Sequence, residues 1–119
     1  MPAIMYPRVG MTKALDYEIQ PEAAQELQKT GGTVFLDVRE PWERDTARIE
    51  PSKHIPMGDI PGRIQELDPE QHLIVYCHHG VRSMNVTAWL RQQGFEQAQS
   101  MAGGIDRWSR AIDPKVPLY

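Results

Sequence analysis

Two short apolar runs constrain the fold of this chain more than any other feature. The segments "TVFLDV" (33–38) and "HLIVYC" (72–77) are rich in β-branched and aromatic residues and show almost no alternation of polar and apolar side chains. Such runs are typical of strands buried on both faces, as in parallel sheets covered by helices. The sequence therefore predicts two central strands of a parallel sheet.

Helical and weaker strand patterns surround these two runs. Proline near a start and glycine at an end favour a helix in "PEAAQELQKTGG" (21–32), and helical spacing or an early proline favours others. Further helices are predicted over 40–48, 83–94 and 104–112, with a short one from about Pro61, and weaker strands over 16–20, around His54 and Ile55, and over 97–101. This alternation predicts a three-layer α/β domain with a mostly parallel central sheet flanked by helices.

The length of the chain limits how many domains it can form. Its 119 residues suit one compact domain and are too few for two ordinary ones. Residues 1–15 contain Pro2, Pro7 and Gly10 without a clean period, and we predict a loose N-terminal arm there. Residues 16–119 are predicted to form the single domain.

Charge and cysteine content exclude several functional classes. A net charge of −3, with no basic stretch interleaved with aromatic residues, argues against direct nucleic-acid binding. One cysteine cannot close an internal disulfide, so a reducing compartment fits best. No apolar run has the length of a signal peptide or membrane span. We therefore predict a cytoplasmic protein that does not associate with membranes.

The single cysteine, Cys77, lies at the end of a predicted central strand, where ligands bind in such sheets. Gly80 follows where the backbone must turn, and a helix begins shortly afterwards. A loop that closes onto a helix N-terminus can point several N–H groups inward, which favours a bound anion or a nucleophilic thiolate. Arg82 adds a permanent positive charge suited to a sulfur oxyacid or phosphate.

A lone cysteine also has a simpler interpretation. Free cysteines are often small buried apolar residues without chemical function. A core cysteine, however, needs no glycine-containing loop and arginine after it. The context of Cys77 therefore favours a functional thiol.

Several motifs together resemble the rhodanese family of sulfurtransferases in its single-domain form. They are "LIVY" followed by "CHHGVRS", "LDVREPWE" upstream and "GFEQAQSMAGGIDRWS" downstream. The resemblance runs from about Asp16 to Ile112. Each motif alone is weak, but their joint order is specific.

This resemblance implies a mechanism and a set of site residues. Cys77 would attack the sulfane sulfur of an anionic donor such as thiosulfate, and the resulting persulfide would pass sulfur to cyanide or a thiol. Inward N–H groups would stabilise the anionic sulfur without a metal or organic cofactor, and Arg82 would hold the donor. The implied substrate-binding loop is His78, His79, Gly80, Val81, Arg82 and Ser83.

The two loop histidines leave two interpretations open. His78 and His79 could line the mouth of the site and make activity depend on pH, or they could point to solvent. They also raise the question of a metal site. Adjacent residues rarely converge on one ion, and His54 and His72 lie on other elements, so no metal site is predicted.

The remaining conspicuous side chains are predicted to have structural roles. Asp37 and Arg39, at a strand end, are interpreted as support for the loop. Trp42, Trp89 and Trp108 lie on apolar helix stripes, which predicts core packing for all three. Glu43, Arg44 and Asp45 are expected to form a solvated face.

Three other functions share the same motifs. Phosphatases and arsenate reductases related to rhodaneses have five residues between cysteine and arginine, whereas Cys77 and Arg82 have four between them. The shorter loop favours sulfur as the transferred atom. A persulfide carrier in a relay between proteins would use the same Cys77. An inactive interaction module is ranked last, because the cysteine is present.

Overall fold

A computed structural model describes residues 15–119 of the chain, and the predicted arm over 1–15 lies almost wholly outside them. The strands are β1 (Glu18–Ile19), β2 (Thr33–Asp37), β3 (Lys53–His54), β4 (His72–Tyr76) and β5 (Gln99–Met101). The α-helices are α2 (Pro21–Thr30), α3 (Pro41–Thr46), α4 (Val81–Gln92) and α5 (Gly104–Ala111). Two short 3₁₀ helices, η1 (Met57–Asp59) and η2 (Pro61–Glu66), lie between β3 and β4.

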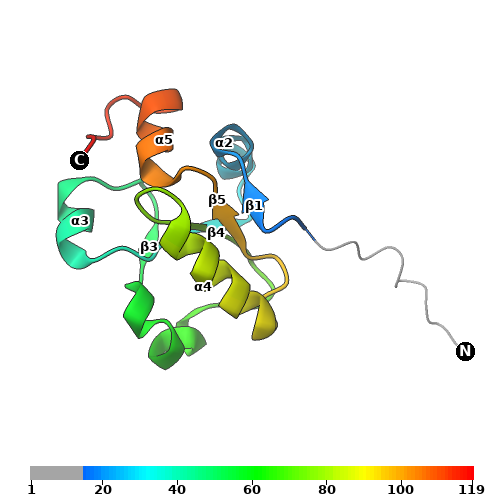
Figure 1. Cartoon of the computed structure of the whole chain (residues 1–119). Helices are drawn as coiled ribbons and strands as arrows, with labels where there is room; N and C mark the ends of the chain where they lie inside the picture. Colours follow the sequence, from blue (N-terminus) through cyan, green and yellow to red (C-terminus); the bar gives the residue numbers. More distant parts are fainter. Residues whose placement is uncertain (1–14) are drawn as a thin grey trace, which may run out of the picture.

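The five strands form one sheet in the order β1-β5-β4-β2-β3 (Figure 1). Every recorded strand pair in the described chain is parallel. β2 and β4 pair along their whole lengths, from Thr33 opposite His72 to Asp37 opposite Tyr76. The predicted α/β fold is confirmed, with the two apolar runs as neighbouring interior strands.

Alternation of side chains along β2 and β4 divides the core into two clusters. Leu36, Val75 and Cys77 pack with Val86 and Leu90 of α4 on one face of the sheet. On the other face, the cluster comprises Phe35, Ile74, Tyr76 and residues of α2, α5 and the C-terminal segment, among them Ala24, Ile105 and Trp108. Both faces of these strands are buried, which explains why their sequences lack polar alternation.

The predicted helices and strands occur close to their expected positions, with two differences. α4 begins at Val81, two residues before the predicted start at Ser83. The short helix from Pro61 is a 3₁₀ helix with non-helical backbone angles at Arg63. β3 is an edge strand, as its neighbouring prolines predicted. Within residues 15–119, no helix is both long enough and apolar enough to cross a membrane.

Candidate active site

Cys77 directly follows the last residue of β4 and is 1% exposed. Its carbonyl oxygen accepts a 2.8 Å hydrogen bond from the backbone N–H of Ile105 in α5. Its side chain belongs to the α4 face of the core. Two contacts therefore fix the position of Cys77. Its backbone is hydrogen-bonded to α5, and its side chain packs against α4.

Two backbone N–H groups point at the sulfur of Cys77. The N–H of Gly80 lies 3.1 Å from Sγ and that of Ser83 lies 3.3 Å away. Gly80 reaches this position in the left-handed region, with φ of +107°, which a side chain would disfavour. These are the inward donors that the loop pattern predicted, although only two of the loop residues supply them.

Ser83 provides a second contact through its hydroxyl group. The thiol is 3.4 Å from Ser83 Oγ, which lies 2.7 Å from the hydroxyl oxygen of Ser100 on β5. Both serines are fully buried. Because hydroxyl hydrogens rotate, this pair can accept from a thiol or donate to a sulfur anion.

Arg82 is paired within the protein. Its Nη1 and Nη2 donate to the two carboxylate oxygens of Glu43, at 2.7 and 2.9 Å. The hydrogen bonds from Arg82 lower the pKa of Glu43 to about 2 despite its burial. Glu43 is 3% exposed, so its predicted place on a solvated face is wrong. A six-residue helix such as α3 is too short for its pattern to reveal which side is covered.

Tyr119 links Glu43 to a second buried charge. The Tyr119 hydroxyl donates to Glu43 at 2.7 Å and accepts from Nη1 of Arg39 at 2.9 Å. Burial is the main cause that raises the pKa of Tyr119 to about 12. The hydroxyl therefore remains protonated at neutral pH and bridges the two charged groups.

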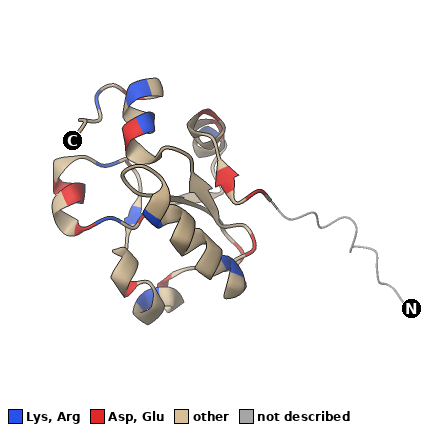
Figure 2. Cartoon of the chain, in the orientation of Figure 1, with Lys and Arg blue, Asp and Glu red and all other residues tan. Residues whose placement is uncertain are grey.

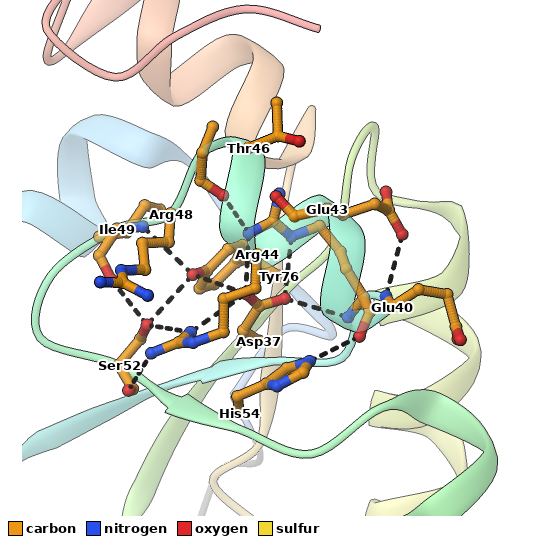
Figure 3. Close-up of polar contacts among 12 residues, drawn as sticks. Asp37, Glu40, Glu43, Arg44, Thr46, Arg48, Ile49, Ser52, His54 and Tyr76 are labelled. Atoms are coloured by element: carbon orange, nitrogen blue, oxygen red, sulfur yellow. Dashed lines mark hydrogen bonds and ion pairs between the residues drawn. The ribbon is translucent and has the colours of Figure 1, made fainter.

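Asp37 and Arg39 form a fully buried ion pair at the end of β2. Figure 3 shows Asp37 between Arg44 and Tyr76, whose side chains contact it. Nε and Nη2 of Arg39 donate to the two Asp37 oxygens at 2.9 and 2.8 Å. Burial favours the neutral acid, but the hydrogen bonds from Arg39 outweigh it and lower the pKa of Asp37. Arg44 also reaches Asp37, at 3.2 Å, and is mostly buried, so its expected solvation is wrong, whereas Asp45 is exposed as predicted.

His78 and His79 lie side by side. Their ring centroids are 3.9 Å apart, and the Tyr119 ring lies 3.9 Å from that of His78 and nearly parallel to it. His78 is partly buried and His79 is exposed. Burial, followed by the charge of His79, lowers the pKa of His78. His78 is thus partly covered by the protein, whereas His79 lies in solvent. Neither of the two interpretations left open by the sequence therefore applies to both residues.

Gly104 allows α5 to approach the loop. A Cβ atom at Gly104 would lie 2.5 Å from the carbonyl oxygen of Cys77 and closer still to that of His78, and the residue has φ of +62°. The loop and the residues before α5 are also close at Gly80, where a Cβ atom would lie 3.3 Å from the backbone nitrogen of Gly103. The consecutive glycines Gly103 and Gly104 are the feature of the sequence from which this close packing could have been predicted.

The three tryptophans do not share one environment. Trp108 is 3% exposed and packs edge-on against Phe35, which confirms its predicted core position. Trp89 is partly buried against the α4 cluster. Trp42 is 63% exposed, so its predicted core packing is wrong. It lies next to Glu43 on α3 and meets the ring of Tyr119 edge-on.

These features define a class: small parallel α/β domains that present a cysteine loop at the carboxyl end of a central strand. The Rhodanese-like domain family model matches residues 20–111. The chain belongs to this family, as its motifs predicted.

Similar proteins agree with this family. Thiosulfate sulfurtransferase GlpE of Pseudomonas syringae is 38% identical over 90 residues, which span 76% of this chain and 84% of that protein. Rhodanese-like/PpiC domain-containing protein 12 of Arabidopsis thaliana is 38% identical over 89 residues, or 71% of this chain but only 30% of that longer protein. The crystal structure of a rhodanese-related protein from Thermoplasma volcanium is 30% identical, with a TM-score of 0.77, and covers 87% of this chain and 100% of that one.

Sequence reasoning missed several residues that complete the site. Glu43 pairs with Arg82, Tyr119 donates to Glu43, Ser100 contacts Ser83, and Asp106 lies beside the loop histidines. Each of them is distant in sequence from the residue that it contacts. No local pattern in the sequence marked these four residues.

Proposed function

We propose that this protein is a sulfurtransferase that carries sulfur as a persulfide on Cys77. The donor would be an anion with a sulfane sulfur, such as thiosulfate, and the acceptor would be cyanide or a thiol. The observation that carries this proposal is the pair of N–H groups, from Gly80 and Ser83, directed at the Cys77 sulfur. The named activity of the GlpE relative supports the same reaction class.

In the first half-reaction, the Cys77 thiolate attacks the outer sulfur of thiosulfate. A new S–S bond forms to Sγ as the S–S bond of thiosulfate breaks, and sulfite leaves with the bonding electron pair. The N–H groups of Gly80 and Ser83 stabilise negative charge on the nucleophile. The proton of the resting thiol passes to solvent before the attack.

In the second half-reaction, cyanide attacks the outer sulfur of the Cys77 persulfide. The persulfide S–S bond breaks, its electron pair returns to Sγ, and thiocyanate leaves. The same two N–H groups donate hydrogen bonds to the regenerated thiolate. No redox partner, metal or organic cofactor is needed for the electron balance, and the two steps predict ping-pong kinetics.

We assign Arg82 a positioning role in addition to the donor-binding role expected from the sequence. Two of its N–H groups are engaged by Glu43, which neutralises the pair as a whole. Arg82 also stands between Val81 and Ser83 at the start of α4, so the ion pair orients the segment that supplies an N–H to sulfur. Asp37 and Arg39 support this arrangement through Tyr119.

The remaining loop positions keep the roles that the family resemblance implied. We propose that a donor anion is bound over the loop from His78 to Ser83, where exposed residues such as His79 and Val81 are accessible. A protein persulfide could replace the small donor, because both would deliver sulfur to the same Cys77. A cytoplasmic setting, with thiols as acceptors, is the setting proposed for this chemistry.

The decisive experiment measures persulfide formation directly. Wild-type protein is exposed briefly to thiosulfate, its intact mass is measured, and thiocyanate is assayed after cyanide is added. We expect a gain of one sulfur that cyanide discharges. Cys77→Ser should show neither the gain nor turnover, while its thermal melting stays close to wild type.

Two results would overturn the proposal in different ways. Thiocyanate production retained in Cys77→Ser would remove Cys77 from the mechanism. If wild-type protein gained no sulfur from thiosulfate or mercaptopyruvate, a persulfidated donor protein would be tested with the same mass measurement. No sulfur gain from that donor either would reject sulfurtransferase activity.

A further inference from the structure

A cluster of three metal-ligand side chains lies beside the thiol loop. His78 and His79 come from the loop, and Asp106 comes from the first turn of α5. Each of them offers one ligand atom, and these atoms all lie within 4.8 Å of one another. The sequence argued against a metal because adjacent histidines alone do not enclose an ion, but the fold adds a third ligand from a distant element.

The backbone holds the two elements of the cluster together. The N–H of Asp106 donates to the carbonyl oxygen of His78 at 3.1 Å, next to the bond from Ile105 to Cys77. The absence of a side chain at Gly104 permits this approach, since a Cβ there would collide with the same two carbonyl oxygens. Asp106, in the first turn of α5, is therefore anchored beside the loop without a metal. Figure 2 shows that α5 carries both acidic and basic residues.

The spacing requires only small adjustments to receive an ion. Tetrahedral zinc with bonds of about 2.0–2.1 Å holds its ligand atoms about 3.3–3.4 Å apart. His79 is exposed, so its ring can rotate toward an ion, and Arg110 contacts one carboxylate oxygen of Asp106, which leaves the other oxygen to turn toward the ion. His78 is fixed by its stacking on Tyr119. One rigid ligand and two adjustable ligands suit a site that loads from solvent.

The unbound cluster also contains an unsatisfied polar atom. Nε2 of His78 is buried and has no hydrogen-bond partner within the described residues. The guanidinium of Arg110 also faces the cluster, with its Nε 3.0 Å from an oxygen of Asp106.

We propose that His78, His79 and Asp106 form a binding site for a divalent transition metal such as Zn²⁺. Two imidazoles and a carboxylate are suited to this class of ion, and solvent would complete its coordination. The Cys77 sulfur is not part of the cluster. The bound metal therefore links the first residues of the thiol loop to α5 and does not coordinate the thiol.

The experiment titrates the purified full chain with Zn²⁺ by calorimetry, and with Co²⁺ by absorption spectroscopy. We expect saturable binding of one ion and, with Co²⁺, visible bands of nitrogen and oxygen ligation without the near-ultraviolet band of a thiolate ligand. Cys77→Ser should bind equally well. His79→Ala and Asp106→Asn should each weaken Zn²⁺ binding by at least about tenfold.

Matched variants separate ligand loss from structural damage. Arg110→Gln removes the same ion pair as Asp106→Asn but keeps the carboxylate, so its affinity should equal or exceed that of wild type. His72→Ala removes a histidine outside the cluster, whose Nε2 contacts Gln99, and should leave binding unchanged. Thermal melting without metal identifies any variant that has lost its fold.

Three results would overturn the inference. No saturable binding by the wild type would remove the site, and equal affinity in His79→Ala and Asp106→Asn would move it elsewhere. Loss of binding in Cys77→Ser, together with a thiolate band, would show ordinary metal capture by the reactive cysteine. None of these results depends on whether the protein transfers sulfur.

Discussion

The ends of β2 and β4 are neighbours in one sheet, yet they are built in opposite ways. At the end of β2, Asp37 is buried and accepts hydrogen bonds from Arg39, Arg44 and Tyr76. At the end of β4, Cys77 is equally buried, but its sulfur accepts only from neutral backbone N–H groups, and its thiol donates to the Ser83 hydroxyl. We call these the charged end and the thiol end.

This difference supports a structural role for the charged end and the chemical role that we propose for the thiol end. Every charge at the charged end has a strong partner inside the protein, so reaction there would break an existing network. At the thiol end, N–H groups stabilise extra negative charge on sulfur without neutralising it by a fixed cation. Arg82, the nearest cation in the loop sequence, is committed to Glu43.

The largest effect on stability should follow from breaking the charged end. Arg39→Met leaves the Asp37 carboxylate buried without its main partner, and we expect a loss of about 3–5 kcal/mol in the free energy of unfolding. Urea denaturation measures this loss. Adding Asp37→Asn should recover part of it, because the buried charge is then absent. A loss below about 1 kcal/mol would show that the pair is not structurally important.

The second test uses acid pH to protonate Glu43, which connects the two ends through Arg82 and Tyr119. Glu43 has a pKa of about 2 in the folded protein and an ordinary value of 4.5. Because folding lowers this pKa, its contribution is fully present above about pH 4.5 and is lost as the pH falls toward 2. At about 1.4 kcal/mol for each pH unit, the contribution is about 3 kcal/mol.

The pH dependence of unfolding should therefore be weaker in Glu43→Gln between pH 4.5 and 2. That variant should also be less stable than wild type at pH 7 and closer to it in acid. Glu96→Gln, a change at an exposed glutamate, serves as the control and should titrate like wild type. Parallel curves for wild type and Glu43→Gln would contradict the Arg82 ion pair.

The third test adds a methyl group next to the thiol end and leaves the Cys77 side chain unchanged. Gly104→Ala would place Cβ against the carbonyl oxygens of Cys77 and His78, and we expect a loss of about 2–3 kcal/mol together with slower sulfur transfer. Gly94→Ala is the matched control, because Gly94 also has positive φ but a Cβ there would meet nothing within 4 Å. Equal losses in the two variants would show backbone strain alone.

The smallest effect should come from the hydroxyl that joins the two ends. Tyr119→Phe removes the hydrogen bonds to Arg39 and Glu43 but keeps the ring stacked on His78, and should cost about 1 kcal/mol. Chemical denaturation measures this cost, and persulfide formation is followed in parallel. A change in transfer rate without a change in stability would show that Tyr119 acts on the loop rather than on the fold.

Local patterns were sufficient to predict the main elements and the position of the thiol. The apolar runs marked β2 and β4, and the glycine after Cys77 marked the turn that directs an N–H to sulfur. The same reasoning failed on α3. Trp42 and Glu43 are adjacent there, and the apolar residue is exposed while the charged one is buried, because Arg82 and Tyr119 cover that side of the helix.

The sequence by itself therefore determined a parallel α/β domain and a cysteine at the carboxyl end of a central strand. These features depend on hydrophobic periodicity and turn residues, which act over a few positions. Only the tertiary structure decided that Arg82 meets Glu43, 39 residues away, and that Asp106 lies beside His78. The physical reason is that contacts between distant elements depend on how helices pack against the sheet, and no local pattern records that packing.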